Sequence, residues 1–505
     1  MRSKRKIAAQ PAAAAVFLVI SVLILITSCS NPLRSTIEDV VEAYSMVTDD
    51  GVIYVSATSG SDDNPGLPDK PKKTVLAAVE FMKDNDLTGE VRVAEGTYLL
   101  AEDEKLVVPE GVSVLGGYQE KTWARDYETY QTVIEKDPVT TAITVDFEEG
   151  VTRATVLDGL VINSGIGNTT IAMVIQNCSP TVRNCEISGY GAIENSTAVW
   201  VEGGSPLLEN NIIYGGAGAD SSTGIVVTNG ANPIIRYNAM APGVRSNTVA
   251  IGINVVSSNP YIEGNIIMSD DGGSTTVGIR NAGGAAEIYA NIIDGGYGSD
   301  WTLGIINIDN AQPRIVSNAI HGGFSDGLNN GGSRGIENSN GAAPLIRNNT
   351  ISAGTCDVSS ICIANFSAGS TIENNLLFSQ APSGDTDGYG IFEDEDAGLP
   401  AAVNNNGFFD VDYTYVYPDG GGYLGSTGVA GMETYLGSGI ASDNIMTDDY
   451  FIDINDYLYD GWDLSGSTPT DVTGGGLYVP NEDYPWDRLG RNRTVSWSIG
   501  AYERD

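Results

Sequence analysis

The stretch "NPIIRYNAM" (232–240) returns along the chain as "NPYIEGNII" (259–267), "QPRIVSNAI" (312–320) and "APLIRNNTI" (343–351). Each copy has an apolar residue two and seven positions after a Pro or small anchor residue, and Asn five positions after it. The anchors recur at intervals of 26 to 31 residues, a period typical of solenoids and arrays. These anchors are Pro180, Pro206, Pro233, Pro260, Ala286, Pro313, Pro344, Ser370 and Ala401.

Short β-branched stretches punctuated by Gly and Asn fill the remainder of each repeat, as in "GIVVTNG" (224–230) and "GINVVSS" (252–258). Helical repeats of this length would need two runs with a 3.6-residue period. Each repeat therefore predicts one coil of several short strands joined by turns. Stacked coils place equivalent residues at the strand spacing of roughly 4.8 Å, so that every backbone group pairs with the coils above and below.

The Asn column occupies eight of nine coils, with Cys185 at the same position in the first coil. A buried polar side chain at a turn needs partners. Asn can adopt the left-handed conformation and can hydrogen-bond to its own backbone and to its stacked copy. We therefore predict an asparagine ladder. Its members are Asn211, Asn238, Asn265, Asn291, Asn318, Asn349, Asn375 and Asn406.

With these columns the chain resembles the right-handed parallel β-helix of the pectate-lyase-like superfamily over roughly residues 150–410. The resemblance implies an all-β, right-handed solenoid of about 26–27 residues per coil. It does not imply one activity, because this fold hosts lyases, hydrolases, epimerases and adhesins.

The two ends of the solenoid need caps. Residues 51–84 predict a strand, a polar loop and a short amphipathic helix with Thr74 as its N-cap, and they resemble an N-terminal module of unknown function from secreted bacterial β-helix proteins. "DRLGRNRTVSWSIGAYE" (487–503) resembles the close of a C-terminal domain of extracellular bacterial β-helix proteins. The predicted organisation is a signal peptide (1–28), a tether (29–50), an N-terminal cap with first strands (51–150), repeats (151–410) and an irregular, aromatic-rich C-terminal capping domain (411–505).

A basic start, the apolar run 12–26 and "LITSC" (25–29) follow one another at the N-terminus. The run is short for a membrane-spanning helix. The order resembles the signal peptide and lipobox of a bacterial lipoprotein, which implies cleavage before Cys29 and a lipid on its thiol. We therefore expect an exported protein held by its N-terminal lipid to a membrane of the cell envelope or cell surface.

Charge and cysteine content narrow the classes of partner. The chain has 65 acidic and 26 basic residues, a net charge of −39. This balance argues against nucleic acid, which needs a basic face. The four remaining cysteines match no zinc pattern, so we favour buried free thiols over local disulfides. They are Cys178, Cys185, Cys356 and Cys362.

Catalytic signatures are weak. A β-helix lyase needs a Lys or Arg base, usually with Ca²⁺ on Asp side chains, and no Lys follows Lys136. Three residues after the anchors, Arg and Glu alternate on the first four coils, which predicts an outward ion-pair ladder. A polygalacturonase-type hydrolase needs clustered Asp and His in short motifs; the only His is His321, which we expect at an exposed turn entrance without those motifs.

The loops that follow each repeat should leave the solenoid at one corner and form a wall of aromatic and acidic side chains. Such side chains suit sugar stacking and hydroxyl binding, although acidic Gly-rich loops are more often simply solvated turns. The ligand-binding candidates are Tyr214, Asp270, Asp271, Asp300, Trp301, His321, Asp326 and Tyr389. The short acidic stretches "GSDDNPG" (60–66) and "DTDG" (385–388) are weaker candidates for Ca²⁺ through Asp62, Asp63, Asp385 and Asp387.

We therefore predict an envelope protein with a structural or recognition role toward a polysaccharide or another surface. The alternative is a polysaccharide lyase or glycoside hydrolase acting through the loop wall.

Overall fold

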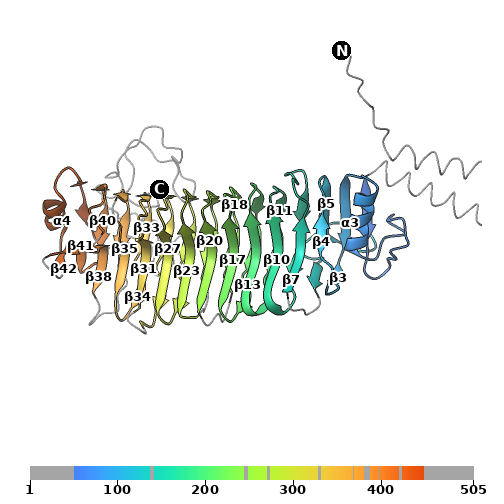
Figure 1. The fold of residues 1–505 in the computed structure, drawn as a ribbon, viewed down its shortest axis with the longest axis horizontal. Helices are drawn as coiled ribbons and strands as arrows, with labels where there is room; N and C mark the ends of the chain where they lie inside the picture. Colours follow the sequence, from blue (N-terminus) through green and yellow to red (C-terminus); the bar gives the residue numbers. More distant parts are fainter. Residues whose placement is uncertain are drawn as a thin grey trace, which may run out of the picture.

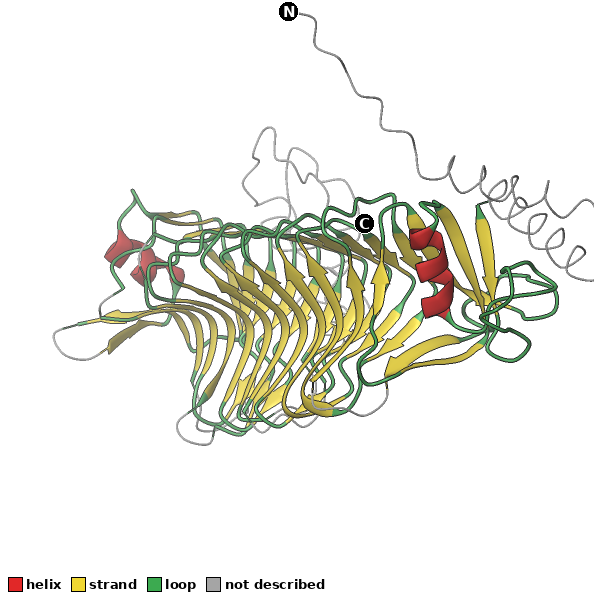
Figure 2. Ribbon diagram, turned by 45° about the vertical axis from the view of Figure 1, so that its right-hand side comes forward, coloured by secondary structure: helices red, strands yellow, loops and turns green. Residues whose placement is uncertain are grey.

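The computed structural model describes residues 51–447, except 137–140, 244–247, 270–272, 328–330, 368, 380–386, 396 and 420–422. In this part the chain winds into stacked coils that form one elongated β-helix, with a short α-helix near each end (Figures 1 and 2). The predicted all-β solenoid is confirmed: three long parallel sheets run along the stack, one strand of each contributed by each successive coil.

Sheet A holds the strands that follow the anchors. They are β1 (Val52–Val55), β2 (Gly89–Ala94), β5 (Val112–Tyr118), β8 (Val156–Asp158), β11 (Thr181–Arg183), β14 (Leu207–Glu209), β18 (Ile234–Arg236), β21 (Tyr261–Glu263), β24 (Glu287–Tyr289), β28 (Arg314–Val316), β32 (Leu345–Arg347), β36 (Thr371–Glu373), β39 (Ala402–Asn404) and β43 (Ala441–Ser442).

Sheet B holds the long strands that precede the anchors. They are β4 (Leu106–Val108), β7 (Thr141–Phe147), β10 (Gly167–Gln176), β13 (Gly191–Glu202), β17 (Ser221–Thr228), β20 (Val249–Val256), β23 (Thr275–Ala282), β27 (Trp301–Ile308), β31 (Gly332–Asn338), β35 (Ser360–Asn365), β38 (Gly388–Glu393), β41 (Tyr413–Pro418) and β42 (Tyr423–Ser426), and the short β16 (Ala217–Gly218) pairs with β13.

Sheet C holds the strands after the Asn corner. They are β3 (Gly96–Leu100), β6 (Thr132–Lys136), β9 (Val161–Asn163), β12 (Glu186–Ser188), β15 (Ile212–Tyr214), β19 (Ala239–Ala241), β22 (Ile266–Met268), β25 (Ile292–Asp294), β29 (Ala319–His321), β33 (Thr350–Ser352), β37 (Leu376–Phe378), β40 (Gly407–Phe409) and β44 (Ile445–Met446).

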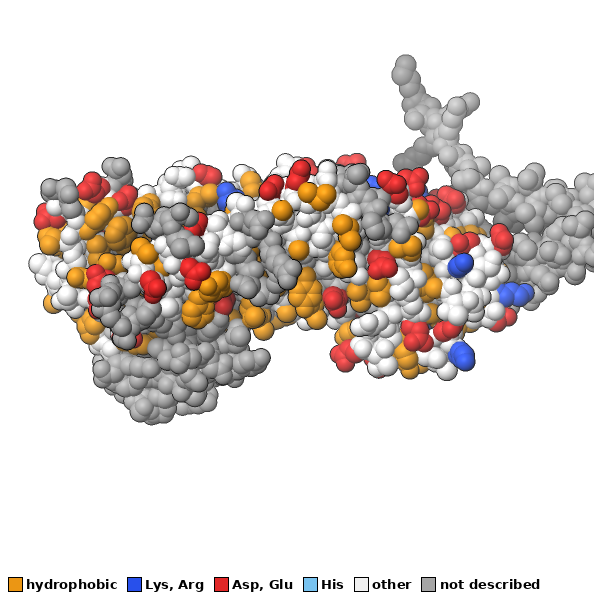
Figure 3. Space-filling model, turned by 90° about the horizontal axis from the view of Figure 1, so that it is seen from below, with side chains coloured by type: hydrophobic (Ala, Val, Ile, Leu, Met, Phe, Trp, Pro, Cys, Tyr) orange, Lys and Arg blue, Asp and Glu red, His pale blue; other side chains and the backbone are white. Residues whose placement is uncertain are grey.

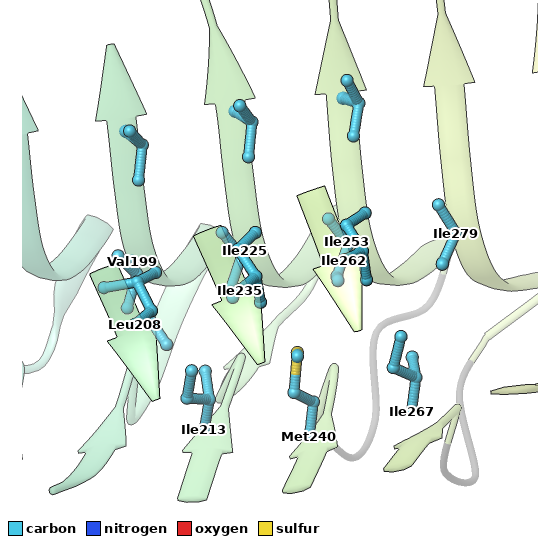
Figure 4. Packing of buried hydrophobic residues seen from close by; sticks show 14 of the residues in the cluster. Val199, Leu208, Ile213, Ile225, Ile235, Met240, Ile253, Ile262, Ile267 and Ile279 are labelled. Atoms are coloured by element: carbon cyan, nitrogen blue, oxygen red, sulfur yellow. The ribbon is translucent and has the colours of Figure 1, made fainter. Parts of the chain in front are cut away.

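Both predicted apolar columns point into the coils. Ile235 pairs in register with Ile262 in sheet A, and Ile267 with Ile293 in sheet C, so identical side chains stack along the axis (Figure 4). All these side chains are buried. Gly252 in sheet B has its α-carbon so close to Ile267 that an added Cβ would lie 2.6 Å from the Ile267 Cγ2. Glycine at this position therefore lets sheet B approach the Ile column.

The asparagine ladder is present at the corner between sheets A and C. Asn265 Oδ1 accepts hydrogen bonds from the backbone N–H (2.9 Å) and Nδ2 (3.0 Å) of Asn238. Asn265 Nδ2 donates in turn to the Ile235 carbonyl (2.9 Å) and to Asn291 Oδ1 (3.0 Å). The same pattern repeats along the column, and Asn444 extends it beyond the predicted members by accepting from Asn406.

One detail of the predicted ladder is wrong. The left-handed residue is not the ladder Asn but the residue before it, including Tyr237 (φ 56°), Gly264 (φ 62°) and Ala290 (φ 53°). That residue makes the turn, and the ladder Asn that follows is free to satisfy the backbone of the neighbouring coil. Because the Asn amides supply this stabilisation, the left-handed position accepts residues with a Cβ despite its cost.

A second buried Asn column, which the repeat alignment did not reveal, lies at the end of the sheet B strands. Asn307 Nδ2 donates to Asn338 Oδ1 (2.9 Å), and Asn338 Nδ2 donates to Asn365 Oδ1 (2.9 Å). This column spans only four coils, beginning at Asn281, so its signal in the sequence is short.

The N-terminal helix is confirmed, and the outward ion-pair ladder is confirmed only in part, because Arg183 pairs with Asp158 of the preceding coil rather than with Glu209. Arg236 contacts Glu209 of the preceding coil at 2.7 Å, and Arg347 contacts Glu373 of the following coil at 2.7 Å. Helix α3 (Val75–Asp84) begins after Thr74, whose side chain accepts from the backbone N–H of Ala77, and it packs its apolar face on β1, β2 and β4. Helix α4 (Val429–Leu436) packs near β41, β42 and β43 at the other end.

We expect Asn265→Ala to lower the free energy of unfolding by about 1–3 kcal/mol. The substitution removes the hydrogen-bond partner of the Asn238 backbone N–H, of the Asn238 side-chain amide and of the Ile235 carbonyl. Chemical denaturation of the purified protein measures the change. Asn232→Ala is the matched control, since Asn232 is exposed and only donates to the Gly230 carbonyl. Equal stability of the two variants would contradict the role given to the ladder.

Candidate functional site

The candidate site lies at the corner where each coil turns from sheet C into sheet B. Three consecutive coils add a two-residue strand there, and these strands form a small parallel edge sheet: β26 (Tyr297–Gly298), β30 (Phe324–Ser325) and β34 (Thr355–Cys356). The loops thus leave at one corner, as the sequence predicted, and in these coils they are ordered by strand pairing.

An open groove of about 620 Å³ runs beside this edge sheet. Its lining residues come from four coils and combine apolar, aromatic and acidic side chains. They are Ala241, Met268, Ser269, Asp294, Gly296, Tyr297 and Phe324. Tyr297 and Phe324 pair in register and are 45% and 46% exposed, so they present two aromatic rings to solvent on adjacent coils.

Acidic side chains border these rings. The Tyr297 hydroxyl donates to Asp326 Oδ1 at 2.6 Å, and Asp326 is exposed. Asp294 lies in the groove wall, where its Oδ1 accepts from the backbone N–H of Gly296 at 2.9 Å. Rings flanked by hydrogen-bonding oxygens are suited to the faces and hydroxyl groups of sugars.

Some predicted candidates meet at this groove. Tyr214 belongs to the same outward column of sheet C as Ala241, with which it pairs, and it is exposed. Asp326 reaches the groove through Tyr297. Tyr297 and Phe324 belong to the aromatic side chains of the predicted loop wall, although they were not chosen among its best candidates. Met268 and Asp294 were not predicted as part of that wall.

The expectation of an exposed His321 is wrong, because its side chain is only 1% exposed. Its Nδ1 accepts from the backbone N–H of Gly323 (3.1 Å) and lies 3.1 Å from Asp294 Oδ1. Ser352 of the next coil caps its own turn in the same way, by accepting from the N–H of Gly354. His321 therefore closes a turn and is buried away from any substrate in solution.

Trp301 is also not at a loop tip. It begins β27 and packs, half-buried, against a small outward cluster containing Ile251, Val277 and Leu303. The Arg334 guanidinium lies 4.2 Å from the centre of the Trp301 ring and forms an ion pair with Glu337. Packing and a cation–π contact thus occupy the indole face that we expected to bind sugar.

The remaining candidates lie apart from the groove or outside the described residues. Tyr389 lies on β38 and stacks on Tyr413 with ring centres 5.7 Å apart. Burial and the adjacent Asp387 carboxylate raise the pKa of Tyr389 to about 12. Asp300 lies just before β27, and its carbonyl accepts from the Ser325 hydroxyl. Cys29, Asp270, Asp271 and Asp385 lie outside the described residues.

The two Asp residues of the N-terminal loop are far from this corner, beside helix α3. Asp62 Oδ1 accepts from the backbone N–H groups of Lys73 (3.0 Å) and Thr74 (2.9 Å), so this carboxylate already supports the start of α3. Among the described residues no group of three or more His, Cys, Asp or Glu side chains is placed to hold a metal ion. Calcium binding stays a prediction.

The four described cysteines are free and buried, which confirms the prediction of buried thiols. Burial raises the pKa of the Cys178 thiol to about 11 and that of Cys185 to about 12, so neither is a reactive thiolate at neutral pH.

The face of the molecule in Figure 3 carries carboxylates along its length, with Lys and Arg mainly toward the N-terminal end. No helix in the described ranges has the length and apolarity needed to cross a membrane.

Residues 58–305 match a family model described as a protein of unknown function, DUF1565. The match to this family model and the stacked coils with their asparagine ladder indicate the same fold. The chain is a parallel β-helix protein. No curated protein matches this β-helix protein in sequence.

Several solved structures resemble this β-helix protein at low identity and low TM-score. The Dettilon tailspike protein is 12% identical with a TM-score of 0.43, over 70% of this chain and 68% of that chain. XylC in complex with xylose is 12% identical with a TM-score of 0.43, over 89% and 98%. The A-module of a mannuronan C-5 epimerase of Azotobacter vinelandii is 16% identical with a TM-score of 0.42, over 73% and 98%. At these scores the likenesses carry no argument about activity.

A buried carboxyl group ends the second Asn column. Glu393 of β38 is 2% exposed and pairs in register with Asn365. The Tyr415 hydroxyl donates to its Oε2, while its Oε1 finds no hydrogen-bond partner among the described residues. Burial raises the pKa of Glu393 to about 7. The folded protein therefore binds a proton at Glu393 more tightly than the unfolded chain does.

We expect this group to make stability fall as the pH rises. Its contribution is fully present below the ordinary Glu pKa of 4.5, is lost between that value and about 7, and is then constant. The size of the loss is about 3 kcal/mol. Denaturation at several pH values should show a flatter profile in this window for Glu393→Gln than for the unmodified protein. Parallel profiles would contradict the raised pKa.

We expect Trp301→Ala to lower the free energy of unfolding by about 2 kcal/mol, less than the roughly 3–5 kcal/mol typical of a fully buried aromatic side chain. Stability falls because Arg334 and the cluster of Ile251, Val277 and Leu303 lose their contacts with the indole ring. Thermal melting and glycan binding are measured on the same variant. A melting temperature that stays unchanged while binding is lost would return Trp301 to the role of a ligand anchor.

Proposed function

We propose that this β-helix protein is an exported, lipid-anchored protein of the cell envelope that binds a polysaccharide along the corner groove. The observation that carries the proposal is the pair of half-exposed rings, Tyr297 and Phe324, stacked in register beside the groove. The rings adjoin Ala241 and Met268 in the groove lining, and contiguous exposed apolar patches mark interaction sites. Loops and edges on a rigid scaffold are also common binding positions.

The groove suits a glycan better than a compact apolar ligand. It is open, and its lining combines the apolar side chains of Ala241 and Met268 with the two rings and the Asp294 carboxylate, while Asp326 accepts from the Tyr297 hydroxyl. Rings on adjacent coils are separated by the coil spacing of roughly 4.8 Å, close to the length of one sugar residue in an extended chain. A glycan lying along the solenoid axis can therefore contact both rings at once.

Recognition is favoured over catalysis by the state of the acid–base groups. The single His is buried in a turn, and Asp294 is engaged by the Gly296 N–H. Arg236 in sheet A and Arg334 in sheet B each form an ion pair, with Glu209 and Glu337 respectively. A lyase base must be free to take a proton from its substrate. The polysaccharide-degrading enzyme remains the second candidate, carried by the carboxylates at the groove.

The export and lipid anchor rest on the N-terminal sequence features, which lie outside the described residues. An anchored recognition protein needs no further membrane contact, because lipid holds it while the rigid solenoid displays its corner groove. The acidic surface favours a neutral glycan, or an acidic one bridged by cations, since a bare polyanion would be repelled.

We expect Tyr297→Ala and Phe324→Ala each to weaken glycan binding at least roughly tenfold, because truncating a hot-spot aromatic side chain costs about 2 kcal/mol or more. Glycan-array screening of the purified protein identifies the ligand, and titration of the variants measures the loss. Tyr423→Ala is the control, since Tyr423 is 48% exposed but lies on β42.

Two outcomes count against the proposal. Binding that is unchanged in both ring variants would remove the groove from the account. Release of reducing ends or unsaturated uronates from a panel of acidic polysaccharides would establish the enzyme instead.

A further inference from the structure

The exposed apolar side chains of the solenoid gather on one side. Between residues 151 and 327, the described large apolar side chains that are exposed all lie on sheet C or at its corners with sheets A and B. Figure 3 views the molecule from the side of the corner between sheets C and B, and hydrophobic side chains recur along it. Single exposed apolar residues are ordinary, but a contiguous set marks an interaction surface.

This corner carries one exposed apolar side chain in each of the three coils that precede the groove. They are Ile166 (50% exposed), Tyr190 (55%) and Tyr214 (42%). The structure describes residues 141–243 without a gap, so these three coils are complete at the corner. The next four coils contribute the groove residues Ala241, Met268, Tyr297 and Phe324. Together these residues form an apolar stripe along seven successive coils.

Strand pairing holds the backbone at the first part of the stripe. Gly167 of β10 pairs with Ala192 of β13, and Ala192 pairs with Gly218 of β16. The pairing of β26 with β30 does the same for Tyr297 and Phe324. The side chains are therefore presented at the coil spacing, and the seven coils span roughly 29 Å along the axis.

The shape of the stripe selects the kind of ligand. It is long but about one side chain wide, so it offers only a few hundred Å², whereas a stable protein interface buries roughly 800 Å² on each partner. An extended peptide repeats its same-face side chains every 6.6–6.8 Å or so, which does not match a coil spacing of roughly 4.8 Å. A sugar unit in an extended chain is close to that spacing, so successive sugars meet successive coils.

We infer that the ligand is a long linear polysaccharide, and that an inner segment of about seven sugar units lies along the whole stripe from Ile166 to Phe324. The inference rests on the proposed glycan-binding function and extends its site by three coils beyond the groove. Each sugar unit added to a fragment reaches one more coil, so the protein selects long chains over short ones.

The test separates the two parts of the stripe. The probes are linear xylan, glucomannan and, with Ca²⁺ present, polymannuronate, each as the polymer and as fragments from the trisaccharide to the decasaccharide. Titration calorimetry on the full-length protein measures each affinity. Tyr190→Ala changes the stripe roughly 19 Å from Tyr297 along the axis, and Tyr297→Ala changes the groove. Tyr423→Ala on β42 is the control outside both, and thermal melting checks that every variant is folded.

We expect the affinity of the unmodified protein to rise with fragment length up to about the heptasaccharide. Tyr190→Ala should weaken binding of the polymer and the decasaccharide at least roughly tenfold and leave the trisaccharide unchanged, because a trisaccharide on the ring pair does not reach Tyr190. Tyr297→Ala should weaken binding at every length.

Two results would overturn this inference in different ways. If Tyr190→Ala binds every length as the unmodified protein does while Tyr297→Ala is weakened, the stripe is wrong and the groove keeps its proposed function. If neither variant is weakened, or if no probe binds, the stripe and the proposed function fall together.

Discussion

The asparagine ladder is the constraint on which the rest of the structure depends. Each ladder Asn bonds both to the backbone of the neighbouring coil and to the next Asn, so the corner between sheets A and C must repeat with the same geometry in every coil. Asn318 and Asn349 are 31 residues apart and Asn406 and Asn444 are 38 apart, yet their amide contacts stay at 3.0 and 3.1 Å. Extra residues are therefore accommodated away from this corner.

That constraint separates the parts of a coil that can vary from those that cannot. The inward Ile columns and the close approach of Gly252 to Ile267 are tied to the ladder register, so they tolerate little change. The corner between sheets C and B is instead held by buried hydroxyls, as where Ser196 donates to the Gly215 carbonyl of the next coil (2.6 Å), and it carries the edge sheet with Tyr297 and Phe324. A binding groove built there changes its side chains without disturbing the stack.

The same register also explains why isolated polar residues are poor guides to chemistry in this fold. His321 occupies a column in which Ser352 also caps a turn, so its nitrogen serves the backbone. Arg236 continues an outward ion-pair ladder. Stacking places each residue beside its counterparts in adjacent coils. A polar side chain therefore pairs with a neighbouring backbone group or charge rather than with a ligand. The rings of Tyr297 and Phe324 differ because they remain 45% and 46% exposed.

The sequence by itself determined the coil, both apolar columns, the main Asn ladder, the Glu209–Arg236 ion pair and the Thr74 cap, because each depends on a repeated spacing or on a local capping contact. Only the tertiary structure decided the burial of His321, the packing of Trp301 under Arg334, the second Asn column and the part of Asn444. It also joined Met268, Asp294, Tyr297 and Phe324 into one groove. These features depend on the path of loops of unequal length and on which side chains lie beside one another in adjacent coils, and residue spacing does not encode either.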